Sequence, residues 1–345
     1  MKKYYASLFI LVFSFVLRIV NISVNPPSLT WDEVSIGYNA YSILKTGKDE
    51  HGKFFPLDTF IAYGDYKPPL AIYLTVPSIA VFGLNAFAVR FPSALFGSLT
   101  ILVFYYLIRE LFHRIRKNFH GIEYLPFLSS LLFAISPWHI NLSRAGFEAN
   151  IALFFVTLGT YLILKTRYNH NLWIIALIPY VLSVYTFNSA RYFVVIFSFG
   201  LLLFCADTIK RSWKQCFFGA SVAIILLLPI SGHLLSKEAR LRFVEVNIFS
   251  DIKIVQTANE RLARSKDFIN SMVNNRRVGY ARSYLIHFFD NLEPEFLFIS
   301  GDGNPKFSIR DVGQLYYIEA PFFIIGLFGL FVFNWKIGLL LLYWV

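Results

Sequence analysis

The stretches Thr30-Trp31-Asp32-Glu33 and Tyr66-Lys67-Pro68-Pro69 place two carboxylates and a lysine shortly after the first apolar run of the chain. The first stretch matches the capping-box pattern Thr-x-x-Glu, which begins a helix, and Gly47 is suited to end that helix. We therefore predict an amphipathic helix over residues 31–46 that lies on a membrane surface. Its apolar side chains recur at helical spacing, at Val34, Tyr38, Tyr41 and Leu44.

The composition around these stretches is that of a membrane protein. Of the 345 residues, 56% are hydrophobic and 15% are charged, whereas a soluble domain has about 25% charged residues. Apolar runs of about 20 residues recur along the chain, and one such run is enough for a helix to cross a bilayer. We predict an all-α polytopic membrane protein of about nine or more transmembrane helices.

Basic residues fall in short clusters between the apolar runs, the distribution that places positive loops in the cytoplasm. The clusters at 1–3, 113–117 and 210–214 are predicted to lie inside. This pattern accounts for the net charge of +11, and we predict no nucleic-acid partner. The run at 69–83 is too short for a span and contains Pro77, so we predict that it lies in the interface or re-enters.

Three parts follow from the predicted spans. Residues 1–232 form a transmembrane core whose first outer loop, 25–89, carries the catalytic site. Residues 233–316 form a polar extracytoplasmic domain, and residues 317–345 form C-terminal helices of which the last is incomplete. The spans are predicted at 4–24, 90–112, 122–140, 149–165, 172–187, 191–206, 216–232, 317–334 and from 337 onward.

In this topology several charged side chains lie at the outer face of the membrane. Ionisable groups at membrane depth are costly to desolvate, so they are candidates for functional residues. Such a set suits the transfer of a sugar from a lipid-linked phosphate. Cations would hold the phosphate as it leaves, and a carboxylate, for which we choose Asp32, would take the proton of the attacking hydroxyl. The set comprises Asp32, Glu33, Lys67, Arg144, Glu148 and Arg191.

Each of these residues also has a structural interpretation. The two carboxylates of the first stretch can cap a helix and complement its dipole. Lys67 can reach toward the membrane surface as an interfacial lysine. Arg144 and Glu148 are four residues apart and can pair on a helix. His139, beside Trp138, can be a satisfied interfacial histidine.

The motifs, taken in order, resemble those of membrane glycosyltransferases of the GT-C fold, especially the branch of protein O-mannosyltransferases and the lipid A aminoarabinose transferase. Asp32-Glu33 is similar to the Asp-Glu pair that follows that family's first span. Lys67-Pro68-Pro69-Leu70 resembles its x-Pro-Pro-Leu segment in the lysine-bearing form. Ser143-Arg144-Ala145-Gly146-Phe147-Glu148 resembles its Ser-Arg-x-x-x-(Asp/Glu) loop. A large outer domain after the seventh span is also similar to the mannosyltransferases.

The resemblance implies an inverting glycosyltransferase in the plasma membrane, with several membrane passes and its active site on the extracytoplasmic face. Its implied partners are membrane lipids, a polyprenyl-phosphate-sugar donor and an acceptor hydroxyl on a protein, a lipid or a glycan. The catalytic carboxylates would be Asp32 and Glu33, and the donor phosphate would be bound by Lys67, Arg144 and Arg191. Supporting residues would be Glu148, His139, Asp302 and Asn304.

The cofactor and the acceptor stay open at this point. A divalent metal ion is possible in the family, and Asp32 and Glu148 would be the residues to hold it. The segment 301–305, Gly-Asp-Gly-Asn-Pro, is a turn by composition and could fold back over the site. The predicted outer domain is short and lacks the repeated sugar-binding module of the mannosyltransferases, which leaves a protein acceptor undecided.

Two other functions compete with sugar transfer. A transporter or flippase of a lipid-linked or anionic solute would also use charges at membrane depth, but it predicts inverted repeats and broken helices at the midplane. The second is a structural subunit whose outer domain binds a partner. This function does not explain why the charged residues gather at one face of the membrane. The location of the charges at one face favours chemistry at the membrane surface.

Overall fold

The structure, a computed structural model, describes residues 3–113, 123–236, 247–264, 267–309 and 311–344. The described chain is almost entirely helical, as predicted, with one short β-hairpin in addition. It divides into two compact units, one of Met1–Gly232 with Ile318–Val345 and the other of His233–Tyr317. The basic residues predicted inside at 1–2 and 114–117 lie outside the described residues.

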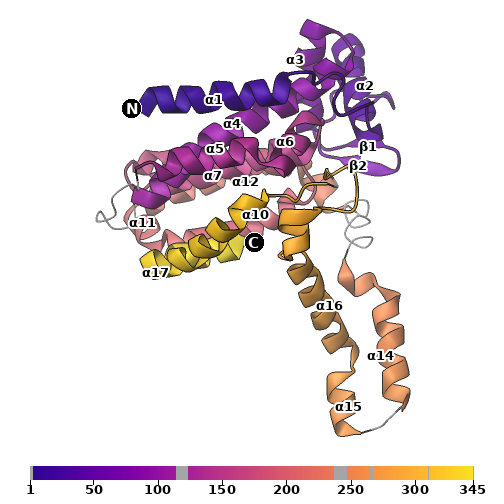
Figure 1. The fold of residues 1–345 in the computed structure, drawn as a ribbon. Coiled ribbons are helices and arrows are strands. Elements are labelled where there is room, and N and C mark those ends of the chain that lie inside the picture. Colours follow the sequence, from indigo (N-terminus) through magenta and orange to yellow (C-terminus); the bar gives the residue numbers. More distant parts are fainter. Residues whose placement is uncertain (1–2, 114–122, 237–246, 265–266, 310, 345) are drawn as a thin grey trace. The chain divides into compact units, whose positions relative to one another are not determined.

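The central helix of the first unit is α4 (Ala86–His113). It packs against α1 (Lys3–Ile19), α5 (Leu125–Ile135) and α7 (Glu148–Lys165), as Figure 1 shows. Helices in a bilayer associate through close packing and interhelical hydrogen bonds, because lipid is as apolar as their side chains. The buried amide of Asn150 in α7 provides such a link, since its Nδ2 donates to the Ser93 carbonyl of α4 at 2.8 Å.

Three described helices are long and apolar enough to cross a membrane, namely α4, α7 and α12 (Trp213–Leu234). The number becomes four if α5 and α6 (Pro137–Arg144), which bend by 57°, form one span. Other apolar helices of the described residues, α1 among them, are shorter, and the helix over Ala320–Trp344 is interrupted at Asn334, whose φ of −158° and ψ of 92° are not helical. The predicted total of about nine or more spans therefore stays a prediction.

Prolines divide two of the predicted spans. The run predicted at 122–140 bends before Pro137, and the run predicted at 172–187 breaks near Leu177, with Pro179 in the first turn of the next helix. Proline lacks an N–H and disfavours helix in the residue before it, so a helix ends there whatever the hydropathy of the run. The helices after α7 in this unit are η1 (His170–Leu172), α8 (Trp173–Ala176), α9 (Ile178–Val184), α10 (Ala190–Phe204), α11 (Ala206–Arg211), α12 and α17 (Ala320–Trp344).

Segment 25–89, which is predicted to lie outside the membrane, contains α2 (Trp31–Thr46) and α3 (Leu70–Phe82), joined through a hairpin. The predicted bounds of the first helix are confirmed, because Thr30 and Glu33 form the capping box and Gly47 adopts φ 70° at its end. Its buried face packs with α3 in one apolar cluster. The predicted stripe of Val34, Tyr38, Tyr41 and Leu44 is exposed; that it lies on a membrane stays a prediction.

The β-hairpin of strands β1 (Phe60–Ala62) and β2 (Asp65–Lys67) was not predicted. Its two loop residues, Tyr63 and Gly64, both have positive φ, as a type I′ turn requires. Type I′ turns usually have Asn-Gly or Asp-Gly at these two positions. Because Tyr63 stands at the first position here, the sequence did not indicate the turn. The register pairs Phe60 with Lys67, so the hairpin positions the lysine opposite a buried aromatic side chain.

α3 has 13 residues, which corresponds to about 20 Å of helix. A bilayer core is about 30 Å thick, so this helix alone is too short to cross it. The length agrees with the prediction that residues 69–83 do not form a span. That they lie in the interface stays a prediction.

The second unit is built around two facing helices, α14 (Ile252–Arg264) and α16 (Arg276–Asp290). The short α15 (Phe268–Val273) lies between them in the sequence. The other elements in and beside this unit are η2 (Ile248–Ser250), the π-helix η3 (Glu295–Ile299) and η4 (Tyr317–Glu319).

Candidate functional site

The N-termini of two helices and the hairpin bring three predicted residues together. Asp32 lies in the first turn of α2, Glu148 begins α7, and Lys67 ends β2. The Lys67 ammonium donates to Asp32 Oδ1 at 2.8 Å and to Glu148 Oε1 at 2.9 Å. We call these three residues the lysine cluster.

The residues of the lysine cluster differ in exposure. The side chains of Lys67 and Glu148 are 7% and 11% exposed, whereas that of Asp32 is 20% exposed. The interpretation of Lys67 as an interfacial lysine that reaches toward solvent is therefore wrong. Asp32 is the member of the cluster that a substrate can most easily reach.

Electrostatics favour the charged form of Lys67. Burial by itself would lower the pKa of Lys67, but the negative charges of Glu148 and Asp32 outweigh it and raise the pKa above its usual value. The first turns of α2 and α7 also favour negative charge, because unpaired backbone N–H groups give a helix N-terminus a partial positive charge. The site therefore presents an ammonium between two carboxylates.

Glu33, the neighbour of Asp32, has different partners. Arg90 of α4 donates to its Oε1 from Nε at 2.6 Å, and both side chains are almost completely buried. The backbone N–H groups of Thr30 and Gly146 donate to the same carboxylate at 2.8 and 3.1 Å. With these partners Glu33 anchors α2 to α4 and to the loop before α7, and its predicted catalytic role stays a prediction.

Arg90 also fixes the chain that leads from α1 into α2. Its Nη1 donates to the carbonyls of Ile22 and Pro26 at 2.9 and 2.7 Å, and its Nη2 donates to that of Ser28 at 2.5 Å. The loop before Asp32 is thereby held by one buried guanidinium. No role was predicted for Arg90, although an arginine at the start of an apolar run is itself a signal.

Gly146 lets the loop before α7 approach Glu33. A Cβ at this position would lie 3.1 Å from Cγ of Glu33, closer than an ordinary contact. Because Gly146 precedes Glu148 by two residues, this approach helps to place Glu148 beside Lys67. The Ser-Arg-Ala-Gly-Phe-Glu motif thus has a steric reason for its glycine.

Arg144 has partners other than those predicted from its spacing to Glu148. It donates from Nη1 to the Leu17 carbonyl at 2.9 Å, and from Nη2 and Nε to that of Asn25 at 2.9 and 3.2 Å. It therefore ties α6 to the end of α1, while Glu148 accepts from Lys67 instead. Segment 141–144, predicted as part of a loop, is the end of α6.

His139 and Arg18 form a second buried polar contact, with Nη2 of Arg18 and Nδ1 of His139 2.8 Å apart. Arg18 also donates to the Ala134 carbonyl at 3.2 Å. Both side chains are completely buried. This contact joins α1 to α5 and α6. The second ring nitrogen of His139, Nε2, is buried without a hydrogen-bond partner among the described residues, so the interpretation of His139 as a satisfied histidine is wrong.

The remaining predicted residues are Arg191, Asp302 and Asn304. Arg191 lies in the first turn of α10, over the ring of Tyr192. Asp302 and Asn304 belong to the second unit, where Asp302 Oδ1 accepts from the Asn304 backbone N–H at 2.7 Å. The turn predicted at 301–305 is present. That this segment folds back over the catalytic site stays a prediction.

The segment between α9 and α10 hydrogen-bonds to the backbone on both sides of Lys67. Asn188 Nδ2 donates to the Tyr66 carbonyl at 2.9 Å, and the Leu70 N–H donates to the Tyr185 carbonyl at 2.8 Å. Both contacts flank Lys67 in the sequence. Asn188 lies between the spans predicted at 172–187 and 191–206, and nothing in the sequence relates it to residue 66.

The residues present do not form a metal site. Among the described residues, no three His, Cys, Asp or Glu side chains lie close enough together to hold an ion. Asp32 and Glu148, the two residues named as ligands should a divalent ion be present, are bridged by the Lys67 ammonium.

Comparison with known proteins relates this geometry to one family. Residues 8–183, which include every member of the lysine cluster, match the family described as dolichyl-phosphate-mannose-protein mannosyltransferase. A Bacillus subtilis protein named "Putative mannosyltransferase YkcB" is 26% identical over 111 residues, which are 32% of this chain and 14% of that protein. The chain thus aligns with a small part of this relative's length. By the match over half of its residues, the chain belongs to the dolichyl-phosphate-mannose-protein mannosyltransferase family.

Proposed function

We propose that this protein transfers a sugar, with inversion, from a polyprenyl-phosphate donor to an acceptor hydroxyl on the extracytoplasmic face of the plasma membrane. The lysine cluster is the observation that carries the proposal, and membership of a mannosyltransferase family supports it. A buried ammonium with two carboxylates from separate helices is costly to desolvate, and such groups concentrate at functional sites.

Asp32 is the proposed general base. Its carboxylate takes the proton of the acceptor hydroxyl while that oxygen bonds to the anomeric carbon, and polyprenyl phosphate leaves with the electrons of the broken bond. Lys67 orients Asp32 through the 2.8 Å contact. Phosphate is a good leaving group when cations stabilise its charge, so the mechanism requires no separate acid.

Cations for the phosphate come from three proposed residues. An ammonium has three N–H donors, of which Lys67 uses two for Asp32 and Glu148. A guanidinium has five, and the hydrogen bonds of Arg144 to Leu17 and Asn25 use three of them. Arg191 is the third proposed cation. The proposed acceptor is a hydroxyl group of a protein, a lipid or a glycan.

The experiment measures release of polyprenyl phosphate from a panel of polyprenyl-phosphate sugars by the complete purified protein. Asp32→Asn keeps the size of the side chain but removes the base, so we expect the rate to fall by about 10²–10⁴-fold. Asp58→Asn is the matched control, because Asp58 also pairs with a lysine of the first outer segment, at 2.7 Å, but at an exposed site. We expect its rate to equal that of the unmodified protein.

Two outcomes would contradict the proposal. Near-normal transfer by folded Asp32→Asn would remove Asp32 as the base. No release from any donor by protein shown to be folded would instead favour movement of a lipid-linked or anionic solute. Thermal unfolding of each variant establishes that the folded state is retained.

A further inference from the structure

The two main helices of the second unit enclose a groove of about 340 Å³ between α14 and α16. They approach closely where α16 has Gly279, since a Cβ there would lie 2.8 Å from Ile254 of α14. The groove has an apolar floor that includes Ile254, Ala258 and Val278. It belongs wholly to the second unit and shares no residue with the lysine cluster.

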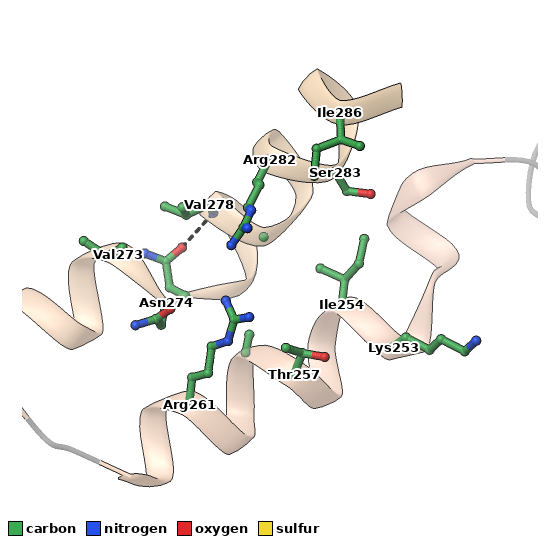
Figure 2. A pocket seen from close by; sticks show the side chains of 13 residues that line it. Lys253, Ile254, Thr257, Arg261, Val273, Asn274, Val278, Arg282, Ser283 and Ile286 are labelled. Carbon is green, nitrogen blue, oxygen red and sulfur yellow. Dashed lines mark hydrogen bonds between the residues drawn. The ribbon is translucent and has the colours of Figure 1, made fainter. Parts of the chain in front are cut away.

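Cations line this groove without any carboxylate. Arg261 of α14 and Arg282 of α16 point toward one another across it, as Figure 2 shows, and Lys253 also belongs to its lining. Within the described residues, neither guanidinium makes a hydrogen bond or an ion pair. Two like charges that face each other are unfavourable unless an anion lies between them. The groove therefore has the charge of an anion site.

Exposed apolar side chains adjoin these cations. Phe268 at the start of α15 is 81% exposed, and Val273 and Ile286 of the groove lining are also exposed. A group of exposed apolar residues on a solvated unit marks a surface that contacts a partner or a membrane. The group comprises Phe268, Ile269, Met272, Val273 and Ile286.

We propose that this groove binds an anionic phospholipid, with the lipid phosphate between Arg261 and Arg282 and the exposed apolar residues in contact with its acyl chains. Guanidinium binds phosphate through charge-assisted hydrogen bonds, and cations beside exposed apolar side chains are the pattern of surfaces that bind anionic membranes. An acidic peptide would satisfy the arginines but would leave Phe268 and Ile269 in water. The inference does not depend on the proposed sugar transfer.

A local readout can test this proposal in the complete protein. Phe268 is replaced by the photo-crosslinker p-benzoylphenylalanine, and the protein is placed in nanodiscs of phosphatidylcholine with or without a small fraction of phosphatidylglycerol. We expect a phosphatidylglycerol adduct on the peptide that contains residue 268. When phosphatidylglycerol is a small fraction of the lipid, the groove is far from saturated. The adduct yield is then proportional to the association constant of this lipid for the groove.

The variant Arg261→Gln/Arg282→Gln should reduce that yield roughly 30-fold, because each basic contact to an anionic lipid contributes about fivefold. Arg264→Gln/Lys306→Gln removes the same charge from the unit at residues that do not line the groove, and should change the yield less than twofold. Arg261→Lys/Arg282→Lys should retain most of the adduct, which separates loss of charge from loss of fold.

Three results would overturn the proposal. They are an equal adduct in pure phosphatidylcholine, an equal loss in the control variant, and a groove that binds polyglutamate but yields no lipid adduct. The last result would assign the groove to an acidic peptide. Because no sugar transfer is measured, failure here leaves the proposed enzyme activity untouched.

Discussion

Asp32 and Glu33 are neighbours in α2 with the same charge, but the fold gives them different surroundings. Glu33 accepts from Arg90 and from two backbone N–H groups, and its side chain is 2% exposed. Asp32 is 20% exposed and is held by Lys67. A carboxylate that is enclosed by donors from three segments stabilises the fold, whereas one that is held by Lys67 and is open on one side can meet a substrate.

Removal of the cation from the more buried pair should have the largest effect on stability. Arg90→Leu leaves Glu33 buried with an uncompensated charge and releases the loop carbonyls of Ile22, Pro26 and Ser28. We expect a loss of about 3–5 kcal/mol in the free energy of unfolding, measured by denaturation in detergent.

The double variant Glu33→Gln/Arg90→Leu serves as the control. With the buried charge removed as well, it should recover part of the lost stability. A wild-type unfolding midpoint for Arg90→Leu alone would show that Glu33 is not an anchor, and the contrast with Asp32 would fail.

Loss of the cation from the lysine cluster should affect activity more than stability. Lys67→Met leaves Asp32 and Glu148 with like charges side by side, and we expect a loss of about 2 kcal/mol, because solvent reaches Asp32. Transfer should fall at least as far as in Asp32→Asn. Lys67→Arg should restore the stability without restoring the rate, since a planar guanidinium does not reproduce the point charge of an ammonium.

The pH dependence of unfolding provides a second test of Lys67. Its pKa is raised in the folded state, so its stabilising contribution is complete below the pKa of the unfolded chain, about 10.4. That contribution is lost only as the pH rises through the still higher pKa of the folded state. Between pH 6 and pH 9 the difference in stability between wild type and Lys67→Met should therefore be constant. A difference that declines within this range would contradict the assignment.

The smallest effect is expected for the exposed pair of Lys53 and Asp58. Their side chains are 50% and 34% exposed, and their contact is 2.7 Å. Exposed ion pairs contribute about 0–1 kcal/mol, so Lys53→Gln should shift the unfolding midpoint little and leave sugar transfer unchanged. A loss comparable to that of Lys67→Met would mean that burial does not distinguish the two pairs.

The sequence by itself determined those features that depend on local chemistry. The capping box at Thr30 and Glu33 and the left-handed Gly47 were predicted to the residue, because both follow from short-range hydrogen bonds and backbone sterics. The nearly all-helical class followed from the apolar runs. Local rules also predicted the turn near Asn304.

Tertiary structure decided which carboxylate has which partner. Lys67 lies 35 residues from Asp32 and 81 from Glu148 in the chain, and no periodicity relates residues at such separations. The hairpin that carries Lys67 turns at Tyr63-Gly64, a pair that is not a typical hairpin-turn sequence, so the hairpin was not predicted. Arg90 stands at the start of an apolar run and falls within a predicted span. Asp32 and Glu33 look interchangeable in the sequence, because their burial and charge partners are set by helices that only the folded chain brings together.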